Sequence, residues 1–183
     1  INLKKSLQNG IYKENLVVTK VEPKVTKEDL KNVNVLLGNY KTVLSDVNPG
    51  RVENIKIATE RTSGILLMPG EEFSYNNHTG MRTEVNGYKN ATVISAGEAV
   101  QGLGGGVCQV STTLYNAVLK ISSLQVTERH EHSNKVPYIK NGKDAAVAYG
   151  SYDFKFKNNS GFDIKIKATA TANNVTITLN KIY

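Results

Sequence analysis

The single cysteine of the 183-residue chain, Cys108, lies between a run of glycines and an expected helix, in the segment GLGGGVCQVSTTLYNAV. Amides in the first turn of a helix have no partners within the helix, and the aligned peptide dipoles place partial positive charge there. A thiol at this position ionises more readily, and the thiolate is the reactive form of cysteine. One cysteine excludes a disulfide within the chain, so Cys108 is a nucleophile, a metal ligand or a buried structural residue.

The glycines before the cysteine favour the nucleophile. Gly104, Gly105 and Gly106 carry no side chains and can adopt positive φ, so a substrate can lie directly against their backbone. Their amides, with that of Cys108, could form an oxyanion hole for a tetrahedral intermediate. A phosphate-binding P-loop is also rich in glycine, but its Lys-Ser/Thr pair is absent here, since Gln109 and a valine follow the cysteine.

The chain has three histidines, and two of them are spaced to act with the cysteine. The segment QVTERHEHSNKVPYI has strand character, and alternate residues of a strand point to the same side. We therefore expect Glu128, His130 and His132 to face one site. With Cys108 opposite, this favours either a thiol–imidazole pair whose base is oriented by a third group, or a zinc site with two histidines and one cysteinate.

Two helices and several strands must position these residues. From Val107 onward apolar residues recur at positions 107, 110, 114, 117, 118 and 121, which predicts a helix packed on a core. A second helix is expected over residues 51–64, with Gly64 at its end. The segment ILLMPGEEFSY indicates two short strands joined by a Pro-Gly turn.

Three strands are expected at the C-terminal end, where apolar and polar residues alternate. The apolar positions are Tyr152, Phe154 and Phe156, then Phe162, Ile164 and Ile166 after the turn NNSG, then Val175, Ile177 and Leu179. This pattern predicts a hairpin and a third strand with one buried face. We therefore predict an α+β fold that contains a mixed or antiparallel sheet, a C-terminal β-meander and a core helix starting at the cysteine.

The composition narrows the possible partners. The formal net charge of +7 and the isoelectric point near 9.4 are compatible with a polyanionic partner. The lysines are dispersed, without the interleaved aromatic residues of a single-strand nucleic-acid groove, so we predict no nucleic-acid partner. The sequence also lacks a run of about 20 apolar residues, which a membrane-spanning helix requires.

From about Arg51 to Phe156 the chain resembles the VanW family. The resemblance rests on RVENIKIA, GILLMPGEEFSYN, TGMRTEVNGYKNA, GGGVCQVSTTLYNAVL, ERHEHS and the segment that begins VPYIKNGKDAAV. It implies an extracytoplasmic envelope protein of a Gram-positive-type bacterium, attached to the membrane only through an N-terminal anchor absent from this chain. Residues 1–45 are then expected to be the end of an upstream peptidoglycan-binding module or a linker, and residues 46–183 the VanW domain.

The resemblance also assigns roles to single residues. It makes Cys108 the nucleophile, and His132 in the HS pair matches the family pattern better than His130. Asp144, in GKDAAV, is the first choice to fix the tautomer of His132, with Glu128 and Ser133 as alternatives, although an Asp there also suits a turn. The candidates for the oxyanion hole or substrate binding are Gly105, Gly106, Gln109, Arg82, Ser133, His130 and Tyr138. Among them Arg82 either holds a substrate carboxylate or makes a structural ion pair.

The activity implied is that of an L,D-transpeptidase acting on peptidoglycan stem peptides. Cys108 would attack the third residue of a stem tetrapeptide, release the terminal D-Ala and form a thioester, which the side-chain amine of a second stem would convert into a 3→3 cross-link. We expect a monomer that needs no cofactor and no metal. Two alternatives stay open: a zinc-dependent amidase or peptidase using Cys108, His130 and His132, and a non-catalytic wall-binding module in which the glycines and the cysteine are structural.

Overall fold

The computed structural model describes residues 8–9, 34–95 and 98–182. The chain divides into two units, Ile1–Asn32 and Val33–Tyr183. The second unit contains all the helices and strands discussed below. Within the described residues, no helix is both long enough and apolar enough to cross a bilayer.

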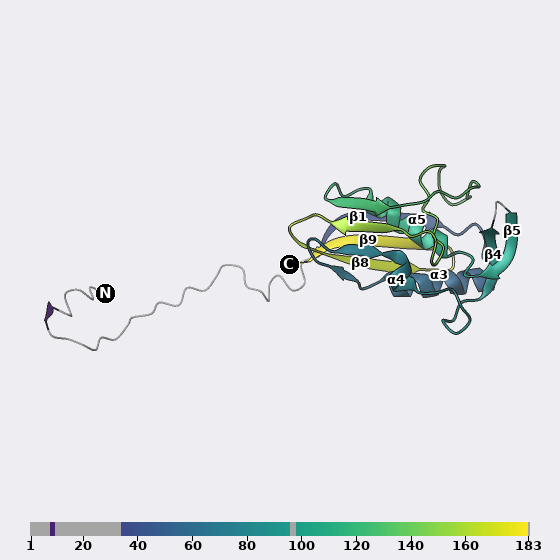
Figure 1. Cartoon of the computed structure of the whole chain (residues 1–183), viewed down its shortest axis with the longest axis horizontal. Helices are drawn as coiled ribbons and strands as arrows, with labels where there is room; N and C mark the ends of the chain where they lie inside the picture. Colours follow the sequence, from purple (N-terminus) through teal and green to yellow (C-terminus); the bar gives the residue numbers. More distant parts are fainter. Residues whose placement is uncertain (1–7, 10–33, 96–97, 183) are drawn as a thin grey trace. The chain divides into compact units, whose positions relative to one another are not determined.

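The main sheet has four strands in the order β1–β9–β8–β2, and each neighbouring pair is antiparallel. Figure 1 shows three of them side by side. The strands are β1 (Val35–Val43), β2 (Leu66–Leu67), β8 (Asp163–Ala170) and β9 (Asn174–Ile182). Alternate side chains of β8 and β9 point into the core because successive residues of a strand face opposite sides. The fully buried ones are Ile164, Ile166, Val175, Ile177 and Leu179.

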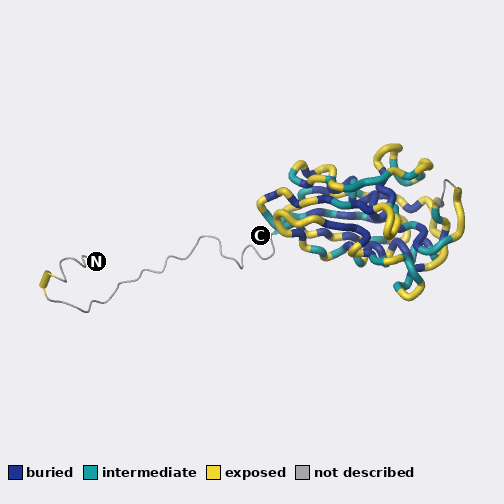
Figure 2. The backbone as a smooth tube through the Cα atoms, in the orientation of Figure 1, coloured by how far each residue is buried: buried dark blue, intermediate teal, exposed yellow. Residues whose placement is uncertain are grey.

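Two helices pack against this sheet and against each other. Helix α3 (Pro49–Thr62) contacts β8, and helix α5 (Val107–Val118) contacts β1 and β9. At the start of α3 the side chain of Asn48 accepts a hydrogen bond from the Gly50 amide, and Pro49 occupies the first helical position, where its missing N–H costs nothing. Apolar residues of both helices join the sheet in one core, which Figure 2 shows as the dark interior of the molecule.

Two smaller sheets complete the fold. One has the order β3–β7–β6, with β3 (Glu72–Ser74), β7 (Lys155–Asn158) and β6 (Leu124–Glu128). The other pairs β4 (Asn90–Ser95) with β5 (Glu98–Leu103) at one end of the ribbon in Figure 1. The short helix α4 (Tyr75–Thr79) follows β3. Because β5 ends at Leu103, it leads directly into the glycines that precede α5.

The predicted α+β class is confirmed, and α5 starts one residue before the cysteine. The predicted pairing of β8 with β9 is also confirmed. One pairing of the expected meander is wrong, because β7 pairs with β3 and β6 rather than with β8. The buried amide of Asn158 explains this: it donates hydrogen bonds to the carbonyls of Leu67, at 2.9 Å, and Phe162, at 3.0 Å, and so turns the chain from one sheet into the next.

The expected division of the chain at residues 45 and 46 stays a prediction, since most residues before it lie outside the described ranges. Strand β1 nevertheless precedes that division and is hydrogen-bonded to β9 from Val35 to Val43. Residues 35–43 therefore fold as part of the main sheet.

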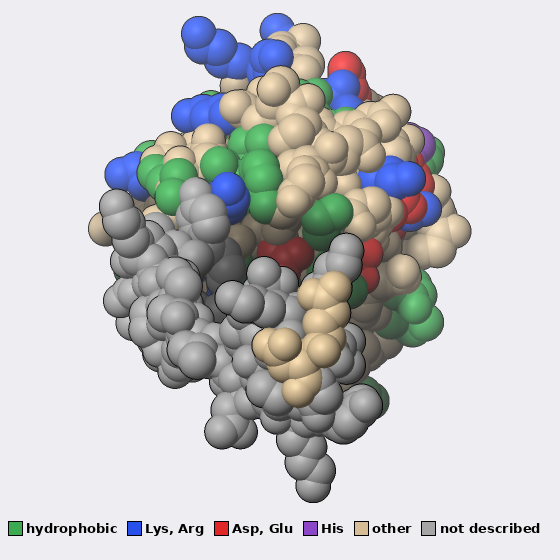
Figure 3. Space-filling model, turned by 90° about the vertical axis from the view of Figure 1, so that its left-hand side faces the viewer, with side chains coloured by type: hydrophobic (Ala, Val, Ile, Leu, Met, Phe, Trp, Pro, Cys, Tyr) green, Lys and Arg blue, Asp and Glu red, His purple; other side chains and the backbone are tan. Residues whose placement is uncertain are grey.

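Basic side chains are spread over the face of the molecule drawn in Figure 3. On the face drawn in Figure 3, Lys and Arg side chains lie at separate places around the rim, and acidic side chains lie close to some of them. Lys165 and Lys167 occupy the exposed side of β8. That the chain has no nucleic-acid partner stays a prediction.

Candidate active site

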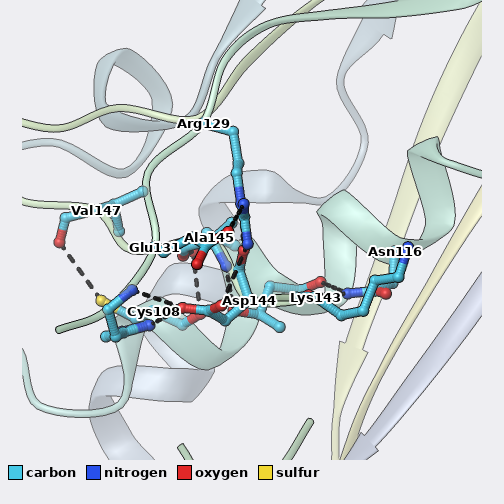
Figure 4. A network of polar contacts seen from close by, with 11 residues as sticks. Cys108, Asn116, Arg129, Glu131, Lys143, Asp144, Ala145 and Val147 are labelled. Carbon is cyan, nitrogen blue, oxygen red and sulfur yellow. Dashed lines mark hydrogen bonds and ion pairs between the residues drawn. The ribbon is translucent and has the colours of Figure 1, made fainter. Parts of the chain in front are cut away.

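Cys108 is the second residue of α5, and its side chain is partly buried. Its Sγ atom donates a hydrogen bond of 3.4 Å to the carbonyl oxygen of Val147, drawn as a dashed line in Figure 4. Burial raises the pKa of the Cys108 thiol, but a side-chain hydrogen bond to His132 and the charges of His132 and Arg82 act the other way, so the pKa is lowered overall. The site therefore favours the thiolate, the reactive form.

His132 lies between this thiol and a buried carboxylate. Its Nδ1 atom is 2.5 Å from Oδ2 of Asp144, and the same oxygen accepts a hydrogen bond of 2.7 Å from the His132 backbone amide. Because Nδ1 is held by Asp144, Nε2 is the ring nitrogen left for the thiol. Burial lowers the pKa of His132, but Cys108 and Asp144 outweigh this, so its pKa is raised overall. A low thiol pKa beside a high imidazole pKa favours a thiolate–imidazolium pair.

Arg129 holds the carboxylate from the other side. Its Nε atom donates to the backbone carbonyl of Asp144 at 2.6 Å, and an Nη atom donates to Oδ1 at 3.2 Å. The other Nη atom pairs with Glu131 at 2.6 Å, and the guanidinium lies 5.2 Å from the centre of the Tyr115 ring. Asp144 is only 5% exposed, so these contacts replace the water that a buried carboxylate loses. Figure 4 shows Arg129 reaching this carboxylate.

One face of α5 fixes the segment 143–147, which carries the carboxylate. Cys108, Ser111, Thr112 and Asn116 are spaced i, i+3, i+4 and i+8, so they share a side of the helix. The side chains of Ser111, Thr112 and Asn116 make hydrogen bonds of 2.6, 3.0 and 2.7 Å to backbone atoms of residues 143–147. The nucleophile and the segment bearing its partner acid are therefore held on the same helical face.

The glycines before α5 are required by close packing. Gly104 and Gly106 have φ values of +86° and +103°, which residues other than glycine rarely adopt. A β-carbon at Gly104 would lie 2.5 Å from Cγ of Arg82, and one at Gly105 would lie 2.9 Å from Cβ of Ala91. At Gly106 it would lie 2.9 Å from side-chain atoms of α3. The expected roles of Gly105 and Gly106 in an oxyanion hole stay predictions.

Gln109 does not lie where a substrate could reach it, so its expected role in substrate binding is corrected. Its side chain is fully buried, and its Oε1 atom accepts a hydrogen bond of 2.8 Å from Arg51 of α3. Its Nε2 atom donates to Oγ1 of Thr42, at 3.1 Å, and to the carbonyl of Val43, at 3.0 Å. One residue along a helix turns the side chain by about 100°, so Gln109 ties α5 to α3 and β1 instead.

Glu128, His130 and His132 do not face one site as the strand pattern predicted. Strand β6 ends at Glu128, so the alternation does not continue through the histidines. His130 interacts with Glu128 at 3.1 Å and packs against Tyr152 with the two rings tilted and their centres 4.6 Å apart. Glu128 also pairs with Lys155 at 2.8 Å. Of the three acid or hydroxyl candidates for orienting His132, the structure therefore brings Asp144 to the ring.

The positions of the two histidines also test the zinc alternative, which needs Cys108, His130 and His132 to lie close together. The two imidazoles bind separate carboxylates, those of Glu128 and Asp144. In the part of the chain that the structure describes, no three His, Cys, Asp or Glu side chains are grouped so that they could hold a metal ion. The arrangement fits a thiol–imidazole pair and not the proposed zinc ligand set.

The remaining candidates for substrate binding are Arg82, Tyr138 and Ser133, which differ in burial and in contacts. Arg82 donates to Oδ1 of Asn76 at 2.7 Å and to the Gly80 carbonyl, and its charge acts on the Cys108 thiol. Tyr138 is half-buried, and burial raises its pKa, as does the nearby Cys108. Ser133 is exposed directly after His132. Substrate contacts by these side chains stay predictions.

Arg129 and the polar face of α5 were missed by reasoning from the sequence. The signal for the helical face was present, since Cys108, Ser111, Thr112 and Asn116 form a polar stripe beside the apolar one. A buried polar stripe indicates a hydrogen-bonded neighbour on that side. Arg129 gave no comparable signal, because its partner Asp144 is distant in sequence.

Comparisons with known proteins agree on one family. The family model described as VanW like protein matches residues 50–180. The uncharacterized protein YoaR of Bacillus subtilis (strain 168) is 40% identical over 160 residues, 87% of this chain and 52% of that protein. The vancomycin B-type resistance protein VanW of Enterococcus faecalis (strain ATCC 700802 / V583) is 29% identical over 124 residues, 65% of this chain and 45% of that protein. The chain spans about half the length of these curated relatives. No solved structure matches it.

Proposed function

The chain belongs to the family of VanW-like proteins, and on that premise we propose that it is a peptidoglycan L,D-transpeptidase with Cys108 as its nucleophile. A relative named for vancomycin B-type resistance supports a role in the cell wall. The observation that carries the proposal is the Cys108–His132–Asp144 arrangement. A nucleophile, a base and a group that orients the base are the parts that acyl transfer requires.

The first half of the reaction is acylation. The thiolate of Cys108 attacks the carbonyl carbon of the third residue of a stem tetrapeptide, so that a C–S bond forms and the carbonyl electrons move to oxygen. The amides of Gly105 and Gly106 stabilise this oxyanion. The imidazolium of His132 then gives its proton to the leaving nitrogen, the C–N bond breaks and D-Ala departs.

The second half transfers the acyl group. The side-chain amine of another stem peptide attacks the thioester carbon, and neutral His132 accepts its proton. The C–S bond breaks, the Cys108 thiolate is regenerated and a 3→3 amide bond remains. Asp144 keeps the ring in the orientation that serves both steps and stabilises the imidazolium.

Product analysis tests this proposal. The full chain and its Cys108→Ala variant are incubated with disaccharide-tetrapeptide, and the muropeptides are analysed by mass spectrometry. We expect 3→3 dimers and free D-Ala with the native chain only. Tripeptide without dimers would show that the chain hydrolyses the stem peptide and does not cross-link it. Unchanged tetrapeptide, with the thiol shown to be reduced, would overturn the proposal.

A further inference from the structure

Arg82 is a half-buried cation whose hydrogen bonds go to neutral oxygens. One Nη atom donates to Oδ1 of Asn76 at 2.7 Å, and the other donates to the carbonyl of Gly80. Within the residues that the structure describes, no carboxylate forms an ion pair with Arg82. Each Nη atom carries two hydrogens, so each keeps one N–H for a further acceptor. A pair of N–H groups of this kind matches the two oxygens of a carboxylate.

The stem of Arg82 packs against the glycine turn that leads into Cys108. A β-carbon at Gly104 would lie 2.5 Å from Cγ of Arg82, so a glycine is required for the stem to lie this close. The amide of Val107 donates to the carbonyl of Gly104 at 3.2 Å and closes the turn one residue before the thiol. The guanidinium of Arg82 lies 6.0 Å from the centre of the Tyr75 ring, and the Tyr75 hydroxyl donates to the carbonyl of Val107 at 3.0 Å. Both the stem and the charged end of Arg82 are therefore linked to the backbone that precedes Cys108.

The other side of the thiol is linked to Arg82 through Asn76. The Asn76 amide that accepts from Arg82 also donates, through Nδ2, to the carbonyl of Ala148 at 3.3 Å. The preceding carbonyl, that of Val147, accepts the hydrogen bond of 3.4 Å from Sγ of Cys108. Contacts therefore run from Arg82 to backbone on both sides of the thiol, and the charge of Arg82 helps to lower the pKa of Cys108. These contacts place the guanidinium beside a substrate carbonyl that Cys108 attacks.

The substrate carboxylate nearest to that carbonyl is the one on the leaving residue. In a peptide that ends with this residue, one nitrogen and one α-carbon separate the terminal carboxylate from the attacked carbon. Standard backbone dimensions place the carboxylate within roughly 4 Å of the attacked carbon. Carboxylates elsewhere on a stem peptide lie further along the chain. A cation beside the thiol therefore suits the carboxylate of the leaving residue.

We propose that Arg82 determines specificity by binding the terminal α-carboxylate of the leaving D-Ala, so that Cys108 attacks only the bond before a terminal residue. The proposal rests on the proposed function, which supplies the leaving residue. A donor that continues beyond this residue has a peptide bond in place of the carboxylate and offers the guanidinium no charge. Arg82 therefore selects tetrapeptide donors over pentapeptide donors.

Donors that differ only in their carboxylates test this assignment. Steady-state kcat/KM is measured for a tetrapeptide with a free terminal carboxylate, for its terminal amide, and for a donor amidated instead on the side chain of a third-position diaminopimelate. We expect the native chain to prefer the free acid over the terminal amide roughly 10- to 150-fold, as for a charged hydrogen bond, and to use the side-chain amide as well as the free acid. A preference that follows the side-chain carboxylate, or no preference, would overturn the proposal.

Variants of two arginines separate recognition of the carboxylate from general destabilisation. Arg82→Gln should use the free acid and the terminal amide equally, whereas Arg82→Lys, which keeps the charge but not the paired N–H groups, should keep part of the preference. Arg61→Gln is the matched control, because Arg61 also donates to neutral oxygens, the carbonyls of Thr79 and Asn86, outside the site. It should keep the full preference. An Arg82→Gln variant that discriminates as well as the native chain would overturn the proposal.

Equilibrium binding separates this proposal from the proposed function. The free acid and the terminal amide are titrated by calorimetry into Cys108→Ala and into the same protein carrying Arg82→Gln. Preferential binding of the acid that requires Arg82, without turnover by the native chain, would support the carboxylate site and overturn the transpeptidase. Turnover without a preference that depends on Arg82 would overturn the carboxylate site alone, and the absence of both would overturn both.

Discussion

The Nδ1 atom of His132 lies 2.5 Å from Oδ2 of Asp144, and that oxygen also accepts a hydrogen bond of 2.7 Å from the His132 backbone amide. Two contacts to one oxygen fix both the position and the rotation of the ring. The carboxylate is itself held by Arg129 and carried on a segment bound to α5. The geometry of the thiol, the imidazole and the acid is therefore set by the fold before any substrate arrives.

His132→Gln should raise the pKa of the Cys108 thiol and lower its reactivity. In the native protein His132 helps to lower the pKa of Cys108, so its loss should move that pKa up toward the usual value of about 8.5. Alkylation of Cys108 near pH 6 should slow, and acyl transfer should fall roughly 100- to 10,000-fold. The rate of alkylation measured across pH checks this.

His78→Gln is the matched control, since His78 binds the Ser74 carbonyl at 2.8 Å and stacks on Phe73, away from the thiol. It should leave the alkylation profile unchanged. An identical shift in both variants would show that the thiol responds to general destabilisation and not to its imidazole partner.

Arg129→Gln should reduce kcat roughly 10- to 150-fold with little change in KM. Arg129 acts through the carboxylate it holds, and losing a charged hydrogen bond of this kind costs on the order of 1.5 to 3 kcal/mol. Arg61→Gln removes comparable hydrogen bonds, to the carbonyls of Thr79 and Asn86, outside the site. It should lower the midpoint of thermal unfolding but keep kcat. Equal losses of kcat in the two variants would rule out a positioning role.

Glu128→Gln should change stability in a pH-dependent way. The hydrogen bond from Lys155 is the main reason why the pKa of Glu128 falls from 4.5 to about 2. Because this pKa is lower in the folded state, Glu128 stabilises the fold above about pH 4.5 and loses that contribution as the pH falls through about 2. The stability difference between wild type and variant, measured by urea unfolding, should therefore shrink over this range. Glu60→Gln, which removes an exposed carboxylate of α3, is the matched control.

Gly105→Ala should destabilise the protein by roughly 1 to 3 kcal/mol. Its new methyl group would clash with the Thr92 carbonyl and the Ala91 side chain, so β4 and the loop before α5 must move apart. Gly161→Ala, where a β-carbon meets no atom within 4 Å, should stay within about 0.5 kcal/mol of wild type. Chemical denaturation of both variants measures the difference, and equal stabilities would contradict the packing seen here.

The cysteine and its helix could be predicted because the signals are local. The apolar period from Val107 onward follows from the helix itself, and the position of Cys108 in the first turn follows from that period. The family pattern indicates Asp144, whereas no local physical signal does. The structure brings it to His132 through side chains of α5 that bind the segment 143–147, which is a long-range effect.

The two wrong predictions, for Glu128 and for Gln109, both arise from long-range contacts. Glu128 and His132 diverge because β6 ends before the histidines, and strand ends are set by pairing partners elsewhere in the chain. Gln109 is buried because Arg51, on another helix, binds it. In both cases the residue types indicate polar or reactive groups, but the surroundings of these groups come from contacts between distant segments.

The most direct test is the mass of the intact protein after brief exposure to a tetrapeptide donor without an acceptor amine. We expect an adduct equal to the donor minus D-Ala, bound to Cys108, absent from Cys108→Ala and formed more slowly by Asp144→Asn. If the native protein keeps its unmodified mass while the donor is intact and the thiol can be alkylated, Cys108 is not an acyl-accepting nucleophile.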